Sequence, residues 1–247
     1  MPYLTDLADA ARKSGLKVVE EPGWKSRGHG PMVDVRTIVC HHTAGPTAGN
    51  MPSLGVVRDG RTGLRGPLSH LTLARDGTVY VVAAGLCYHA GAVGRTDHSN
   101  GYAIGIEAEA TGVTSWPAVQ MDAYARLCAA LATHYDVALS HIVGHKEIAT
   151  PKGRKIDPNF SMPAFRSRVA AVDLKPKGDK NQKTRRAILA AEKAGALFVA
   201  ALEKSEKEAR AAGQRVVAAR LKLRIKSEKA YIGRLGKRRV ALRPKKK

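Results

Sequence analysis

Hydrophobic and polar positions follow two different periods over the first 174 residues. Short β-branched or alternating runs predict strands over residues 35–40, 68–73, 78–83, 103–110 and 142–143. Apolar residues three or four positions apart predict helices over 4–14 and 118–134. Because these elements form no regular βαβ repeat, we expect an α/β domain in which a mixed central β-sheet is flanked by helices.

The pattern changes after residue 180. Residues 181–232 are rich in Ala, Lys, Arg, Glu and Leu and contain no proline, which predicts a basic α-helical C-terminal segment. Gly195 and Gly213 interrupt it, so two or three helices and one long helix all remain open. The last five residues, 243–247, are predicted to be disordered.

Charge divides the chain at the same place. The 247 residues hold 42 Lys and Arg against 21 Asp and Glu, a net charge of +21. Residues 1–174 contain 18 basic and 15 acidic residues, whereas residues 175–247 contain 24 and 6. With Pro176 and Gly178 in between, this shift predicts two domains, 1–174 and 175–247. All nine histidines and all three cysteines lie in the first, so we expect the chemistry there.

Several protein classes can be set aside. An apolar content of 44% excludes disorder of the whole chain, and no apolar run approaches the roughly 18–20 residues that span a bilayer. The first residues show no secretory signal. Three cysteines without a CxxC pair argue against a disulfide framework. We therefore expect a protein that is made and first kept in a reducing cytoplasm.

Two histidine positions follow predicted strands. His41 and His42 come directly after residues 35–40, His145 comes after residues 142–144, and Asp157 lies 12 residues further on. Two histidines and a carboxylate suit a three-ligand zinc site with water in the fourth position. From spacing alone, surface or capping roles remain an alternative. Since neighbouring strand residues face opposite ways, only one of His41 and His42 can readily point at a metal.

Six blocks of sequence carry a resemblance to a known family. Residues 38–45 (IVCHHTAG), 69–80 (SHLTLARDGTVY), 88–91 (YHAG), 104–109 (IGIEAE), 144–147 (GHKE) and 155–158 (KIDP) resemble, in order, the blocks of zinc N-acetylmuramoyl-L-alanine amidases of type 2, which are related to peptidoglycan recognition proteins. Residues 16–24 and 27–30 resemble actinobacteriophage endolysins in particular. The resemblance covers about residues 35–160.

The resemblance implies a mixed sheet with a zinc cleft along one face. Its zinc ligands would be His41, His145 and Asp157, and it favours His41 over His42. Some relatives have Cys as the third ligand, whereas the matching residue here is Asp157. As an endolysin, the protein would wait in the host cytoplasm until lysis and then reach the cell wall.

The remaining roles also follow from the resemblance. Glu107 would be the general base and acid, and Lys155 would stabilise the oxyanion. The alternative interpretation of Lys155 is a solvated residue of a basic run. Glu109 is the second candidate for the base. Some members have Tyr where this chain has Ser69. A mechanism assisted by tyrosine is therefore not expected here, and the catalytic role falls to Glu107. His70 and His89 would bind substrate, with a structural role as the alternative.

The basic residues 175–247 have no family match, and their charge suits an anionic partner. We expect them to bind anionic wall polymers or a membrane surface, with a passive solubilising helix pair as the alternative. Nucleic acid is disfavoured because only Phe198 and Tyr231 could stack on bases and no Cys/His finger is present. We expect a monomer.

The expected activity is zinc-dependent hydrolysis of the amide between N-acetylmuramic acid and L-alanine in peptidoglycan, which lyses the cell wall. Two other classes remain open. One is a non-catalytic peptidoglycan or muropeptide receptor of the same fold, and such receptors typically lack a zinc ligand. The other is a basic nucleic-acid-binding protein, whose binding would fall steeply with salt.

Overall fold

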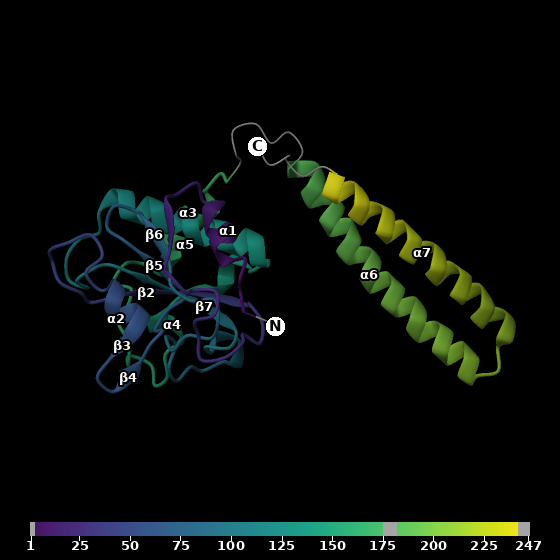
Figure 1. Cartoon of the computed structure of the whole chain (residues 1–247). Coiled ribbons are helices and arrows are strands. Elements are labelled where there is room, and N and C mark those ends of the chain that lie inside the picture. The colour runs from purple at the N-terminus through teal and green to yellow at the C-terminus, as the bar shows by residue number, and fades with distance from the viewer. Residues whose placement is uncertain (1–2, 175–181, 242–247) are drawn as a thin grey trace. The chain divides into compact units, whose positions relative to one another are not determined.

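A computed structural model describes residues 3–174 and 182–241 of the chain, and the chain divides into two compact units, Met1–Leu174 and Lys175–Lys247 (Figure 1). The first unit contains a six-stranded sheet and the second a helical hairpin. None of the described helices is both long and apolar enough to cross a membrane.

The sheet of the first unit has the strand order β1-β6-β5-β7-β2-β8. Its strands are β1 (Val18–Glu20), β2 (Thr37–His42), β5 (Leu71–Leu73), β6 (Val79–Val81), β7 (Ala103–Ala108) and β8 (Ile142–Gly144). Neighbouring strands are parallel except β5 and β6, an antiparallel pair whose turn contains Asp76 and Gly77. Gly77 has a φ of 86°, which a glycine adopts without strain. The expectation of a mixed central sheet with flanking helices is confirmed.

Three helices, α1 (Leu7–Arg12), α3 (Ala118–Tyr135) and α5 (Met162–Ala170), pack together and supply one side of the main core. The strand residues that meet them alternate along β2 and β7, as the two-residue period of a strand requires. They include Ile38, Cys40, Ile104 and Ile106, all fully buried. The residues in between, such as Val39 and His41, therefore face the other side of the sheet.

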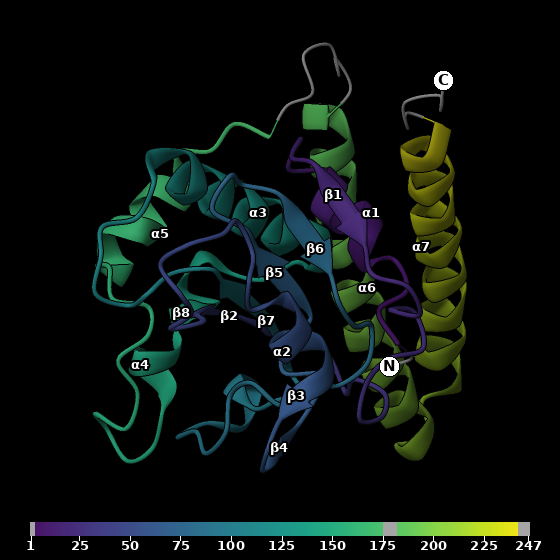
Figure 2. The ribbon, with the colours of Figure 1, turned by 60° about the vertical axis from the view of Figure 1, so that its left-hand side comes forward.

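That other side is covered by short elements and loops. They include α2 (Leu54–Asp59), the hairpin of β3 (Gly60–Arg61) and β4 (Leu64–Arg65), η1 (Thr96–His98) and α4 (His145–Ile148). The short helix η2 (Leu139–His141) precedes β8 and contacts α5. Figure 2 shows α4 and the β3–β4 hairpin across the sheet from α1 and α3. None of α2, α4, α5, β1, β3 and β4 was predicted, because each is short or lacks a clear hydrophobic period.

The three cysteines, Cys40, Cys87 and Cys128, are buried and free. Cys40 of β2 and Cys128 of α3 meet inside the core, with 3.8 Å between their sulfur atoms. Both behave as small apolar residues at the contact between the helices and the sheet.

The second unit consists of α6 (Gln182–Ala211) and α7 (Arg215–Ala241), which run antiparallel side by side (Figures 1 and 2). Gly213, with a φ of 72°, lies in the turn between them, so the predicted break there is confirmed. The predicted break at Gly195 is wrong, because α6 continues through it. A Cβ at Gly195 would lie 2.9 Å from Cγ1 of Ile232, so glycine allows the two helices to approach closely. The predicted disorder of residues 243–247 lies outside the described residues.

The contact between the two helices follows a heptad pattern, with less exposed residues alternately three and four positions apart. We call this contact the seam. It consists of Ile188, Glu192, Gly195, Val199, Leu202, Glu206 and Ala209 of α6, and Ala218, Leu221, Ile225, Glu228, Ile232 and Leu235 of α7.

Candidate metal centre and active site

The register of two parallel strands places the first two candidate residues side by side. His41 of β2 pairs directly with Glu107 of β7. Both side chains lie on the sheet face opposite the three helices, because Cys40 and Ile106, their neighbours in sequence, face those helices. The Tyr124 phenol of α3 accepts a hydrogen bond from the His41 backbone N–H at 3.0 Å and lies 3.0 Å from the Ile106 carbonyl. The backbone at the candidate site is thus fixed from the core side.

His145 and Asp157 lie next to His41 and come from the segment that follows the neighbouring strand, β8. His145 is the first residue of α4, directly after β8, and the N–H of Lys146 donates to the Asp157 carbonyl at 2.8 Å. Asp157 Oδ2 lies 3.0 Å from His41 Nδ1 and 3.1 Å from His145 Nδ1. The two Nδ1 atoms are themselves 3.1 Å apart. His41, His145 and Asp157 are all buried, so these three atoms meet away from bulk water.

The outer ring nitrogens of the two histidines show where the protons lie. His89 Nε2 is 3.1 Å from the Ala103 carbonyl, which only accepts, so this nitrogen carries the proton and His89 Nδ1 has a lone pair. His89 Nδ1 lies 3.1 Å from His41 Nε2, which must therefore be protonated, leaving the lone pair on His41 Nδ1. His145 Nε2 contacts the Ala90 carbonyl at 2.9 Å and leaves its own Nδ1 lone pair free in the same way.

Three lone-pair atoms therefore meet with no hydrogen between them. Such an arrangement is repulsive unless a cation lies among the atoms. Tetrahedral zinc with ligands at about 2.0–2.1 Å would hold them about 3.3 Å apart, close to the 3.0–3.1 Å seen here. The residues fit a metal, and two imidazoles with one carboxylate match an open catalytic zinc site.

The Glu107 carboxyl lies beside this centre. Its Oε1 is 3.9 Å from His41 Nδ1, and its buried Oε2 has no hydrogen-bond partner among the described residues. Burial, reinforced by the charge of Asp157 and opposed by that of Lys155, raises the pKa of Glu107 to about 8. A carboxyl that titrates close to neutral pH can both accept and donate a proton.

A comparison with known protein families decides what kind of centre this is. Residues 31–160 match the model of Amidase_2, described as N-acetylmuramoyl-L-alanine amidase. The chain belongs to this amidase family. The matched range contains every candidate residue from His41 to Asp157, and membership supports a peptidoglycan amidase activity.

Several solved structures of amidases align with part of the chain. A selenomethionine derivative of AmpD is 24% identical and covers 62% of this chain and 93% of its own, with a TM-score of 0.47. The amidase LysC from Clostridium intestinale URNW is 20% identical and covers 63% and 99%, with a TM-score of 0.48. AmiD from E. coli, in complex with anhydro-N-acetylmuramic acid-L-Ala-D-gamma-Glu-L-Lys, is 21% identical and covers 61% and 65%, with a TM-score of 0.44. No curated protein matches the chain significantly in sequence.

The shifted pKa values of two candidate ligands, His41 and Asp157, favour the protonation states that bind a metal ion. Burial, opposed by Asp157, lowers the pKa of His41 to about 4, so this imidazole is neutral at neutral pH. Burial would raise the pKa of Asp157, but the contacts with His145 and His41 outweigh it and hold that pKa below its ordinary value. A neutral imidazole and an ionised carboxylate are the forms that bind a metal ion.

Glu109, the second candidate for the base, has a different environment from Glu107. It is fully buried, and its carboxylate accepts hydrogen bonds from Thr43 Oγ1 at 2.9 Å and from the backbone N–H and Oγ of Ser53 at 3.0 and 3.1 Å. Arg75 Nη2 lies 3.7 Å away. Glu109 thus holds the loop that follows β2 at both of its ends, through Thr43 and Ser53.

The other histidines named from the sequence have internal contacts. His42 lies near Trp116, with 6.4 Å between ring centroids, and is absent from the metal-competent cluster of the described residues. His70 is fully buried; its Nδ1 accepts the Gly105 N–H at 3.1 Å and its Nε2 lies 3.4 Å from Met32 Sδ. His89 packs over Gly105, where a Cβ would come within 2.6 Å of the ring. Contact of His70 and His89 with substrate stays a prediction.

Sequence reasoning missed the residues that hold the ligands in place. Asn100 Oδ1 accepts the backbone N–H groups of His89 and Ala90 at 3.1 and 2.8 Å. Arg154 donates to the carbonyls of Ala92 and Thr150 at 2.7 and 2.9 Å and so joins two loops around the centre. Neither residue has a sequence signal, because its role depends on a contact between distant loops. Tyr124 occupies an apolar position of the α3 pattern, which conceals its hydroxyl.

Proposed function

We propose that this chain is a zinc-dependent amidase of the endolysin type. It hydrolyses the amide between the lactyl group of N-acetylmuramic acid and the L-alanine of the stem peptide. The observation that carries the proposal is the convergence of His41 Nδ1, His145 Nδ1 and Asp157 Oδ2 beside the unpartnered Glu107 Oε2. The family match supports the reaction class.

His41, His145 and Asp157 would hold the zinc ion, which supplies an activated water and polarises the scissile carbonyl. The protein supplies the proton transfers. Glu107 Oε2 takes the proton of the attacking water and delivers it to the leaving nitrogen of L-alanine, and a pKa of about 8 suits both steps. The hydrogen-bonded chain from Ala103 through His89 to His41 keeps the ligand in one tautomer throughout.

Lys155 is proposed to stabilise the oxyanion that forms on the carbonyl oxygen when water adds to the scissile carbonyl. Burial is the main cause of the shifted pKa values of Glu107 and His41, and the positive charge of Lys155 opposes the rise at Glu107 and adds to the fall at His41. Lys155 therefore acts electrostatically on both residues. A fixed cation there favours developing negative charge. Lys155 precedes Asp157 by two residues and is half-buried.

The experiment that tests the proposal is mass spectrometry of purified peptidoglycan digested by the full chain. Digests are compared with zinc supplied and with zinc chelated. Free stem peptides with new L-alanine amino termini, appearing only with zinc, are the expected result. Intact wall in both digests, from folded and zinc-loaded protein, would contradict the proposal and favour a non-catalytic muropeptide-binding protein.

The endolysin role itself is tested in cells. We propose that the protein stays in the host cytoplasm until lysis, on the resemblance of residues 16–30 to actinobacteriophage endolysins. Expression inside a susceptible bacterium should leave the cells intact until the membrane is permeabilised, and lysis should follow within minutes. Lysis without permeabilisation would contradict this placement.

A further inference from the structure

The charge of the second unit is concentrated on one of its two helices. Residues 215–241, which form α7, contain ten Lys and Arg and one Glu, whereas residues 182–211, which form α6, contain seven and four. The single Glu of α7, Glu228, belongs to the seam with α6. The exposed charged side chains of α7 are therefore all cationic, and they lie among exposed apolar residues such as Leu223.

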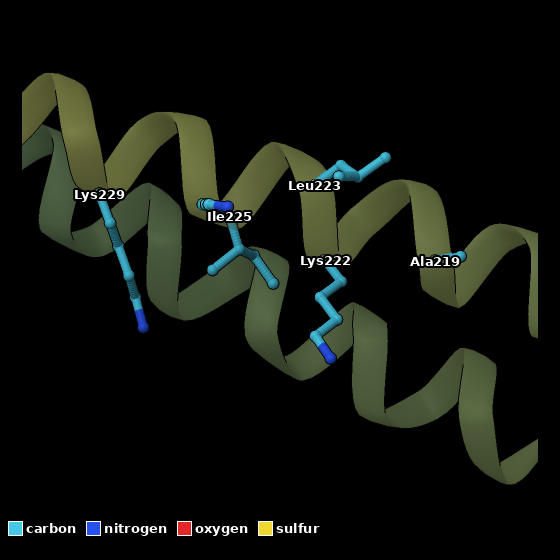
Figure 3. A pocket seen from close by; sticks show the side chains of 6 residues that line it. Ala219, Lys222, Leu223, Ile225 and Lys229 are labelled. Carbon is cyan, nitrogen blue, oxygen red and sulfur yellow. The ribbon is translucent and has the colours of Figure 1, made fainter.

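Eight of the ten basic residues of α7 fall into two rows, one on each side of the seam. Arg220, Arg224, Arg234 and Arg238 recur with helical spacing on one flank, and Tyr231 lies in the same row. At 1.5 Å per residue this row is about 27 Å long. Lys222, Lys226, Lys229 and Lys237 occupy the other flank, where Lys229 pairs with Glu203 of α6 at 2.7 Å. Figure 3 shows Lys222 and Lys229 on either side of Ile225, directed toward α6.

The flank of α6 that adjoins the arginine row carries no charge over nearly five turns. The Arg224 guanidinium lies over the Phe198 ring, 5.4 Å from its centroid, which shows that the two flanks share one face. The uncharged row of α6 consists of Ala187, Ala191, Ala194, Phe198, Ala201 and Ser205. Leu197, next to it on the outside, is 75% exposed, and Phe198 and Tyr231 are 42% and 48% exposed.

We call this surface the arginine face: the uncharged row of α6 with Leu197, and the row of α7 from Arg220 to Arg238. We propose that the arginine face binds the surface of a bilayer that carries anionic phospholipid. An apolar strip beside a row of cations, with aromatic side chains at their border, matches the boundary between acyl chains and headgroups. Lipid phosphates would pair with the guanidinium groups while Leu197 and Phe198 enter the acyl boundary.

The arrangement favours a bilayer over two other occupants. A linear polyanion would engage the lysine and arginine rows alike and would need no exposed leucine or phenylalanine. A second copy of the chain would bring its own arginine row against the same face, and like charges at an interface oppose association. The proposal does not depend on the amidase activity, because vesicle binding is measured without a wall substrate.

The test uses the full chain and two charge variants that each remove three cations. One variant, Arg220→Gln/Arg224→Gln/Arg234→Gln, changes the arginine face. The matched control, Lys222→Gln/Lys226→Gln/Lys237→Gln, changes the lysine flank and leaves the Lys229–Glu203 pair in place. A third variant, Leu197→Gln/Phe198→Gln, removes the apolar contact without changing charge. All these positions are exposed, so the fold is expected to survive, and circular dichroism checks this.

Binding is measured by co-sedimentation with vesicles of phosphatidylglycerol and phosphatidylcholine at 0.1 M salt. The arginine variant should lose on the order of 100-fold in partition coefficient, since each basic residue at an anionic surface contributes about fivefold. The lysine variant should lose less than about threefold, because its charges lie beyond about one Debye length from the bound surface. The Leu197/Phe198 variant should lose about tenfold or more.

Two results would overturn the proposal. Equal losses for the arginine and lysine variants, with no effect of Leu197→Gln/Phe198→Gln, would show plain polyelectrolyte attraction, and duplex DNA would then bind equally well. Failure of the wild-type chain to bind vesicles, together with a dimer in sedimentation that Leu197→Gln/Phe198→Gln dissociates, would show that a second copy covers this face.

Discussion

His89 Nδ1 lies 3.1 Å from His41 Nε2, and this contact decides which nitrogen of His41 faces the candidate metal centre. The contact depends in turn on the Ala103 carbonyl, which fixes the proton on His89 Nε2. The site therefore includes an imidazole outside the ligand set that sets the protonation of a ligand.

His89→Ala should weaken zinc binding by about 10–100-fold, the usual effect of removing a hydrogen-bond partner of a metal ligand. His89→Asn should retain most of the affinity, because an amide oxygen can replace the Nδ1 lone pair. Competition with a chromophoric chelator measures both affinities. Equal affinities for His89→Ala and the wild type would contradict the tautomer assignment. A loss in both variants with the fold intact would instead point to the shape of the ring rather than to its lone pair.

His41 and its neighbour His42 give a matched pair of variants, one inside and one outside the candidate ligand set. His41→Ala should abolish stoichiometric zinc in metal analysis and reduce amidase turnover by more than about 100-fold. His42→Ala should keep the zinc, because the His42 ring lies near Trp116 and is not part of the cluster of His41, His145 and Asp157. Zinc lost from His42→Ala and kept by His41→Ala would reverse the assignment.

Glu107 and Glu109 lie two residues apart, and their contacts predict opposite behaviour. Glu107→Gln should keep the zinc and, at pH 5, the melting temperature, but lose turnover by about 10²–10⁴-fold, the range for a general acid–base group. Glu109→Gln should retain the shape of the pH–rate profile but cost about 1–3 kcal/mol of stability, because an amide N–H₂ would meet donors from Thr43 or Ser53. Thermal melts and pH–rate profiles of both variants separate the roles. Wild-type turnover in Glu107→Gln would remove Glu107 as the base.

The raised pKa of Glu107 also predicts a pH dependence of stability in the metal-free protein. The folded carboxyl keeps its proton up to a pKa of about 8, whereas the unfolded one loses it above about 4.5, so folding binds a proton between these values. The unfolding free energy of the wild type should therefore fall relative to Glu107→Gln as pH rises from 5 to 8. Since 17% of the side chain is exposed, the expected difference is about 2–4 kcal/mol.

Denaturant unfolding of the two chelated proteins at pH 5, 6.5 and 8 checks this. The lowered pKa of His41 has the opposite sign, but it is common to both proteins and cancels in the comparison. A difference that does not change with pH would contradict the burial of an uncharged Glu107.

The sequence predicted those parts of the fold that have a local signature. The long α3, the strands β2 and β7, and the turn at Gly213 follow from hydrophobic period and from glycine. Gly195 misled the same reasoning, because its role is contact with Ile232 rather than a break in α6. The short α4 carries His145 but has no hydrophobic period of its own, so the sequence did not predict it.

The candidate site was predicted as a set of residues but not as an arrangement. Strand alternation separates His41 from His42 on physical grounds, and the cluster contains His41. The family resemblance favours Glu107 over Glu109, but residue type and spacing do not distinguish them, because the difference is the contact of Glu109 with a loop that lies 56 to 66 residues before it. The Asn100 and Arg154 contacts are equally non-local. Physical reasoning from one sequence identifies chemistry, whereas the protonation and support of that chemistry require the folded backbone.

The pairing of His41 with Glu107 in the register of β2 and β7 has a consequence for how such an enzyme can diversify. The separation between the proposed metal ligand and the proposed proton carrier is set by the backbone register of two paired strands inside the sheet. Loops on the side of the sheet opposite α1, α3 and α5 can then be exchanged to recognise different stem peptides, while this separation stays constant. Specificity can evolve, or be engineered, independently of the chemical step.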